Sequence, residues 1–126
     1  MKKFVLLFIG MLMMASVFAQ TNFQELTLEK ALEKAKGENK KVFVDCYTSW
    51  CGPCKMMAEK ELPLKEVGEY MNERFVCIKV DMEKGEGPDL ARKYKVTAYP
   101  TFLVLQADGS LMQRVVGGTL DGKEFI

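Results

Sequence analysis

The sequence predicts an α/β fold, in which a central mixed β-sheet carries helices on both of its faces. Apolar residues recur at helical spacing in several segments, and apolar runs of strand length lie between these segments. The last two runs flank a tight-turn dipeptide, Asp108-Gly109. Strands that alternate with helices pair in parallel, whereas a tight turn joins antiparallel strands. The sheet should therefore contain a central parallel pair and an antiparallel hairpin on one edge.

The first half of the chain begins with a helix, a strand and a second helix. One face of the first helix is formed by four apolar residues, Leu28, Ala31, Leu32 and Ala35. Thr27 is a suitable cap for its start, and Gly37 for its end. Residues 41–46 form a short buried strand, and a loop then leads into a helix that runs to about residue 60. Pro63 interrupts that helix, and a further helical piece resumes over residues 64–72.

The second half supplies the remaining strands. Residues 75–81 combine an alternating apolar pattern with a continuous apolar stretch, as in an inner strand. A turn-rich loop over residues 83–87 precedes a short helix over residues 88–94, with Pro88 in its first turn. Residues 101–105 and 111–116 are the two strands of the predicted hairpin.

The first nineteen residues have the pattern of a signal peptide. Lys2 and Lys3 precede an almost unbroken apolar run over residues 4–17, and Ala19 ends a site that a signal peptidase would read. We therefore expect cleavage before Gln20 and a single exported domain, residues 20–126, in the periplasm. A membrane anchor is the alternative, but the apolar run is short for a bilayer span.

The composition excludes several functional classes. Removing Lys2 and Lys3 from the 18 basic residues leaves 16 against 17 acidic residues, a net charge of −1. This balance gives no indication of nucleic acid as a partner. Four cysteines are too few for a disulfide scaffold. The chain contains no histidine, so the usual proton carrier at neutral pH is missing.

The motif that carries chemistry is Trp50-Cys51-Gly52-Pro53-Cys54-Lys55, which follows an apolar run over residues 42–44. Two cysteines at this spacing fit in the first turn of one helix and can cycle between dithiol and disulfide. Backbone N–H groups at the helix start favour a thiolate on the leading sulfur. Two cysteines at this spacing are weak evidence alone, but all six positions match the active-site motif of the thioredoxin family.

The chain resembles this family from about residue 26 to residue 126. The resemblance implies the thioredoxin fold, protein-disulfide oxidoreductase activity, and no cofactor besides a redox-active Cys51–Cys54 disulfide. The thioredoxin fold ends in a further helix, and residues 121–126 look like its opening. We therefore expect that this last helix is truncated and that the sequence is a fragment or the front of a longer protein.

The resemblance implies three catalytic residues: Cys51, Cys54 and Asp45. Cys51, expected at the exposed end of the helix, would attack a disulfide, and Cys54 would then resolve the mixed disulfide. Asp45 matches a buried acid behind the second cysteine. Burial raises the pKa of a carboxyl, so that it can exchange a proton near neutral pH. The alternative for Asp45 is an ordinary solvated side chain at a strand end.

The resemblance also implies a substrate-binding set: Trp50, Gly52, Pro53, Tyr99, Pro100 and Gly117. Tyr99-Pro100 matches a cis-proline loop whose backbone would pair with an extended substrate. Gly117 would let substrate approach the same groove, and Trp50 would cover the sulfurs. Each has a plain structural alternative: an edge or turn residue for Pro100, a simple turn for Gly117, and a core position for Trp50. Lys55 would add positive potential or be a solvated helix lysine.

Two cysteines depart from the thioredoxin pattern. Cys46 stands where the family usually carries an aromatic core residue, and Cys77 lies near where thioredoxins place a lysine close to the buried acid. We expect both to be buried, inert thiols on opposite faces of the sheet. The segment over residues 61–75 resembles exported thioredoxin-like domains and the soluble C-terminal domain of the transmembrane thiol–disulfide interchange reductases.

The predicted function is the reduction of disulfides in exported proteins. Glycine and proline between the cysteines favour a reductant, whereas an oxidising compartment requires an outside electron source, such as a membrane thiol–disulfide electron donor. One alternative is a redox-active docking domain of a longer protein. Another is a soft-metal module that uses Cys51, Cys54 and a third ligand, although few ligands are present.

Overall fold

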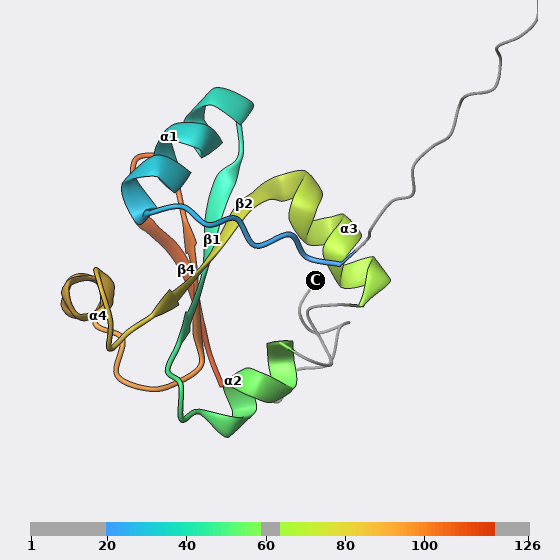
Figure 1. Ribbon diagram of the computed structural model, residues 1–126. Coiled ribbons are helices and arrows are strands. Elements are labelled where there is room, and N and C mark those ends of the chain that lie inside the picture. Colours follow the sequence, from blue (N-terminus) through green and yellow to red (C-terminus); the bar gives the residue numbers. More distant parts are fainter. Residues whose placement is uncertain (1–19, 59–63, 118–126) are drawn as a thin grey trace, which may run out of the picture.

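The computed structural model describes residues 20–58 and 64–117, and these residues form a sheet flanked by helices (Figure 1). The helices are α1 (Leu28–Glu38), α2 (Gly52–Met56), α3 (Lys65–Arg74) and α4 (Gly87–Tyr94). The strands are β1 (Lys41–Tyr47), β2 (Phe75–Asp81), β3 (Thr101–Leu105) and β4 (Leu111–Val116). Within these residues the predicted elements are confirmed with small shifts at their ends. The predicted end of the second helix at about residue 60 lies outside the described residues. The predictions for the signal peptide, the break at Pro63 and the last helix lie outside the described residues.

The strand order is β2-β1-β3-β4. β1 pairs in parallel with β2, while β1 with β3 and β3 with β4 are antiparallel. The parallel pair and the hairpin are therefore confirmed. The prediction that residues 75–81 form an inner strand is wrong for the described part of the chain, where β2 lies at the edge. Its outer side meets the segment around Phe23, through a bridge to Cys77 and a 2.9 Å hydrogen bond from Gln24 N–H to the Cys77 carbonyl. The sequence of β2 has the apolar pattern of an inner strand because helices bury both faces of the sheet at this strand.

Each face of the sheet has its own core, as the alternation of side chains along a strand requires. On one face, residues of α1 and α4 pack against Val42, Val44 and Cys46 of β1. On the other, Met57, which directly follows α2, and residues of α3 pack against Phe43. Asp45 belongs by alternation to the second face, so this carboxyl is directed toward the layer that contains α2.

Short-range chemistry sets the ends of α1. Thr27 caps its start, since its hydroxyl oxygen accepts a 3.2 Å hydrogen bond from Lys30 N–H, as predicted. The prediction that Gly37 ends the helix is wrong. Gly37 lies inside α1, and Asn39 takes the left-handed conformation (φ 57°) and donates its N–H to the carbonyls of Ala35 and Lys36. Asparagine adopts this conformation more readily than most residues, so it can end a helix as glycine does.

Candidate active site

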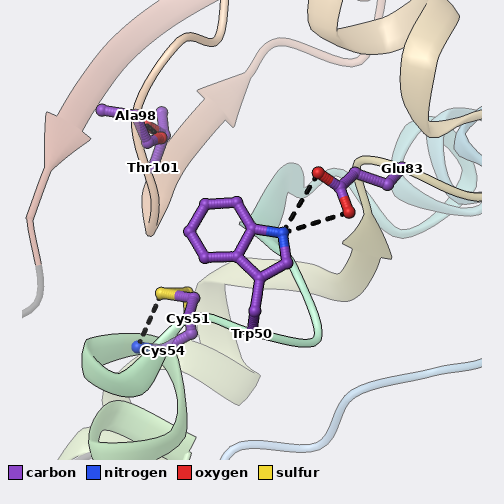
Figure 2. Close-up of a disulfide and its surroundings, with 6 residues drawn as sticks. All are labelled: Trp50, Cys51, Cys54, Glu83, Ala98 and Thr101. Atoms are coloured by element: carbon purple, nitrogen blue, oxygen red, sulfur yellow. Dashed lines mark hydrogen bonds between the residues drawn. A yellow bond between two sulfur atoms is a disulfide. The ribbon is translucent and has the colours of Figure 1, made fainter.

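The two motif cysteines lie at the start of α2 and form a disulfide (Figure 2). Cys51 is the N-cap residue, and its sulfur accepts a hydrogen bond from Cys54 N–H at 3.1 Å. The Cα atoms of Cys51 and Cys54 are 5.3 Å apart, and Pro53 sits in the first turn. Proline suits this position because the N–H that it lacks would have no partner in the helix. A thiolate at Cys51 would meet the same Cys54 N–H, which supports the negative charge.

The expectation that Cys51 is exposed is wrong for the oxidised form. Cys51 is 3% exposed and Cys54 is 6% exposed, while Gly52 and Pro53 between them face solvent. The sulfur of Cys51 is turned into the first turn of the helix, toward Sγ and N–H of Cys54. This inward orientation accounts for the burial.

Asp45 is buried behind the disulfide, as predicted. It is 2% exposed, and it lines the same cavity of about 140 Å³ as Cys54. Burial raises the pKa of Asp45 from 3.8 to about 7, and the positive charge of Lys79 opposes part of this rise. Asp45 is therefore a carboxyl that can take up and release a proton near neutral pH, next to the second cysteine. The alternative of a solvated strand-end aspartate is wrong.

Lys79 was not identified from the sequence. It lies directly opposite Asp45 in the parallel register of β1 and β2, and it lines the cavity. Cys77, which we expected near the lysine position of the family, lies two residues before Lys79 on β2. Since side chains alternate between faces, a lysine two positions from Cys77 lies on the same face. Knowledge of the strand register, which pairs residue 45 with residue 79, would have identified Lys79 as the neighbour of Asp45.

The loop before β3 lies beside the disulfide loop. The Tyr99–Pro100 peptide bond is cis, and Thr101 Oγ1 donates a 2.6 Å hydrogen bond to the Ala98 carbonyl across this turn. Gly117 N–H donates to the Pro100 carbonyl at 2.9 Å. Gly117 has φ 106°, and a Cβ built on it would meet no atom of residues 20–58 or 64–117 within 4 Å. The structure thus brings Gly117 to the cis-proline loop, and none of these residues fills the space beside it.

Trp50 is exposed and held by contacts on two sides. It is 65% exposed, so the core alternative is wrong. Its indole Nε1 donates to both carboxylate oxygens of Glu83 at 3.1 Å (Figure 2). Its ring meets Tyr99 edge-on, with centroids 5.9 Å apart. Glu83 was also missed from the sequence, where it appeared only as the start of a turn-rich loop. These contacts join the loop after β2, the disulfide loop and the cis-proline loop. Lys55 is exposed on α2.

The two remaining cysteines are free, buried thiols on opposite faces of the sheet, as predicted. Burial raises the pKa of Cys46 and of Cys77 to about 12, so neither is a thiolate at neutral pH. Among residues 20–58 and 64–117, no three His, Cys, Asp or Glu side chains are grouped to hold a metal ion. Over the same residues, no helix is long and apolar enough to cross a bilayer.

The arrangement can perform thiol–disulfide exchange. It combines a cysteine at a helix start, a second cysteine bonded to it, and a carboxyl that titrates near neutral pH behind the second sulfur.

Comparisons with known proteins agree with this chemistry. A family model for the thioredoxin-like domain matches residues 28–126. Mitochondrial thioredoxin-3 of Saccharomyces cerevisiae is 39% identical over 97 residues, which cover 77% of this chain and 71% of that protein. Two chloroplastic thioredoxins of Arabidopsis thaliana are longer, and the matches cover 59% and 47% of their lengths.

Two solved structures are similar over most of the chain. A proposed disulphide-isomerase from Bacteroides thetaiotaomicron has a TM-score of 0.75 and 43% identity, covering 87% of this chain and 90% of that one. The oxidised C-terminal domain of DsbD from Neisseria meningitidis has a TM-score of 0.64 and 30% identity, covering 83% and 93%.

Proposed function

Since this chain belongs to the thioredoxin-like domain family and is a thiol–disulfide oxidoreductase of the thioredoxin type, we propose that it reduces disulfides in exported proteins. The observation that supports the proposal most is the disulfide at the start of α2 with a buried, titratable carboxyl in the cavity behind it. Cys51 acts in the first half of an exchange reaction, and Cys54 and Asp45 act in the second.

In the first half, the reduced protein forms a mixed disulfide with its substrate. The Cys51 thiolate attacks one sulfur of the substrate disulfide, a bond forms between the two sulfurs, and the substrate S–S bond breaks. The second substrate sulfur leaves as a thiolate and takes a proton from water. Cys51 performs the attack because its sulfur sits at the helix start, where Cys54 N–H already meets it.

In the second half, Cys54 releases the substrate. Its thiol passes a proton to the Asp45 carboxylate, and its sulfur attacks Sγ of Cys51. The Cys51–substrate bond breaks, the substrate leaves as a thiolate that is protonated, and Cys51–Cys54 is oxidised. The substrate thus gains two electrons that the dithiol loses. A carboxyl with a pKa of about 7 suits the acceptor role, since it is partly ionised at neutral pH.

The substrate would lie across the loops that Trp50 and Tyr99 join. An extended segment of the substrate can pair with the backbone of the cis-proline loop, and within the described part of the chain no atom would meet a Cβ at Gly117. Trp50 would form an apolar wall beside the sulfurs. Trp50, Gly52, Pro53, Tyr99, Pro100 and Gly117 are the proposed substrate-binding residues.

The compartment and the electron source are part of the proposal. The signal-peptide pattern in residues 1–19 supports export to the periplasm, where a reductant must be recharged from outside. The similarity to the DsbD C-terminal domain supports a membrane thiol–disulfide donor as that source.

Two measurements test the proposal. The reduced full chain should reduce insulin disulfides with dithiothreitol as electron source, and Cys51→Ser should abolish this turnover while the fold is retained. In the cells that make the protein, rapid acid quenching and alkylation should find Cys51 and Cys54 mostly reduced in the exported fraction. A protein that is mostly oxidised there, or that stays in the cytoplasm, would contradict the proposed role.

A further inference from the structure

Two buried oxygens beside the disulfide have no hydrogen-bond partner among the described residues: Asp45 Oδ1 and Thr48 Oγ1. Thr48 is 1% exposed and Asp45 is 2% exposed. Both residues line the cavity of about 140 Å³ that Cys54 also lines. A buried polar group without a partner destabilises a protein, so a hydroxyl retained in such a place calls for an explanation.

The position of Thr48 is fixed by the disulfide loop. Thr48 directly follows β1, and its backbone carbonyl accepts a 3.3 Å hydrogen bond from Cys51 N–H. Its side chain is β-branched and has few rotamers. The hydroxyl therefore has few possible positions in the cavity wall, next to the turn that carries both cysteines.

The cavity has the size and the polarity to hold water. Its volume exceeds what one water molecule requires, and it offers a carboxyl, a hydroxyl and, once the disulfide is opened, the Cys54 thiol as partners. Water bonded to Thr48 Oγ1 and Asp45 Oδ1 would satisfy both unpaired oxygens. The same water would lie between Cys54 and the carboxyl that accepts its proton.

We propose that Thr48 is a positioning residue whose hydroxyl holds the water that carries the Cys54 proton to Asp45. This inference rests on the proposed function, because it concerns the release of the mixed disulfide. In the step, the Cys54 S–H bond breaks and its proton moves to the water, while a proton of the water moves to Asp45. The Cys54 sulfur keeps the electron pair and uses it to form the bond to Cys51 Sγ.

Other titratable groups also face this cavity. Lys79 from β2, Tyr47 from β1 and Lys55 from α2 line it together with Asp45 and Cys54. Lys79 lowers the pKa of Asp45 in opposition to burial. The variants that test Thr48 leave all of these groups in place, so a change in the pH profile can be traced to the hydroxyl.

The test compares Thr48→Val, which replaces the hydroxyl by a methyl group of similar size, with Thr48→Ser, which keeps the hydroxyl. Ser49→Ala is a matched control, because Ser49 lines the same cavity but is exposed. Reduced full-length proteins are mixed with insulin, the reaction is quenched in acid, and the mixed disulfide is followed by mass spectrometry. This separates the formation of the mixed disulfide from its release.

Thr48→Val should form the mixed disulfide at the wild-type rate but release it about tenfold more slowly at neutral pH, as loss of part of a proton relay predicts. Its release rate should also lose the wild-type inflection near pH 7. Thr48→Ser and Ser49→Ala should resemble the wild type. In an Asp45→Asn background, Thr48→Val should cause no further slowing, since both residues act on one proton.

Wild-type release rates in Thr48→Val, or equal slowing in Thr48→Ser and Thr48→Val, would overturn the role of the hydroxyl. Additive slowing in the double variant would overturn the shared relay. If Thr48→Val fails to fold, the release rates of Thr48→Ser and Thr48→Ala are compared instead. Slow release in Thr48→Ala alone supports the role of the hydroxyl, and equal rates in the two variants overturn it. Failure of the wild type to reduce insulin would instead overturn the proposed function, so the two failures are distinct.

Discussion

Replacing Asp45 with asparagine should stabilise the protein, by an amount that grows with pH. The folded-state pKa of Asp45 is about 7 and the unfolded-state value is 3.8, so the folded protein binds this proton more tightly. Ionising Asp45 therefore opposes folding. The opposition is absent below about pH 4, grows between about pH 4 and pH 7, and is complete above about pH 7. Each factor of ten in proton affinity corresponds to about 1.36 kcal/mol. Complete ionisation of Asp45 therefore lowers the free energy of unfolding by about 4 kcal/mol.

Urea unfolding of the oxidised full chain measures this difference. Asp45→Asn should gain about 4 kcal/mol in the free energy of unfolding at about pH 8.5 and almost nothing at about pH 4. Asp89→Asn is the control, because Asp89 is exposed on α4 and its substitution should change little at either pH. A gain that is equal at both pH values, or no gain at pH 8.5, would refute the assignment of Asp45 as a buried carboxyl destabilised by its charge.

Lys79→Met tests the charge that opposes this burial. Since Lys79 lowers the pKa of Asp45, its removal should raise that pKa above the wild-type value. Titration of the Asp45 carboxyl by NMR in the oxidised protein checks this directly. An unchanged or lower pKa in the variant would show that Lys79 does not act on Asp45.

Glu83→Ala should release the indole of Trp50, the only tryptophan of the chain, so its fluorescence anisotropy should fall and kcat/KM for insulin should drop a few-fold. If neither changes, Glu83 does not hold Trp50 in solution. Gly87→Ala should cost about 1–3 kcal/mol in the free energy of unfolding, because a Cβ there would overlap the backbone of residues 81 and 82. Gly37 is the control, because it lies inside α1 and a Cβ there would contact no described atom within 4 Å. Gly37→Ala should leave the free energy of unfolding unchanged or raise it by up to about 1 kcal/mol. Equal effects of the two substitutions would contradict the close backbone approach at Gly87.

The strands and the disulfide motif could be predicted because their signals are local. Residues 75–81, 101–105 and 111–116 have in the structure the bounds that their apolar patterns indicate. The cap at Thr27 depends on a residue three positions away. The pair Cys51 and Cys54 lies within one helical turn, so its disulfide follows from spacing and family resemblance.

The missed features depend on contacts between distant segments. Lys79 meets Asp45 only through the register of two strands, 34 positions apart in sequence, which the sequence does not specify. Glu83 reaches Trp50 across 33 positions, because the loop after β2 passes beside the disulfide loop. The burial of Cys51 depends on which way its sulfur turns in the first helical turn, and cysteine spacing carries no information about that.

The helix end was misassigned for a different reason. Glycine is the commoner residue after a helix, yet here Gly37 continues α1 and Asn39 takes the left-handed conformation. Both residues suit the position, so the local sequence does not decide between them.

The most direct test of the account is the alkylation of the reduced full chain over a range of pH, with each cysteine resolved by mass spectrometry. Cys51 should react first and remain reactive at mildly acidic pH, below the pKa of about 8.5 for an ordinary thiol. Cys46 and Cys77 should stay unlabelled in the folded protein, because burial raises the pKa of each thiol to about 12. Equal labelling of all four cysteines, or no selective reaction at Cys51, would contradict a nucleophile activated at the start of α2.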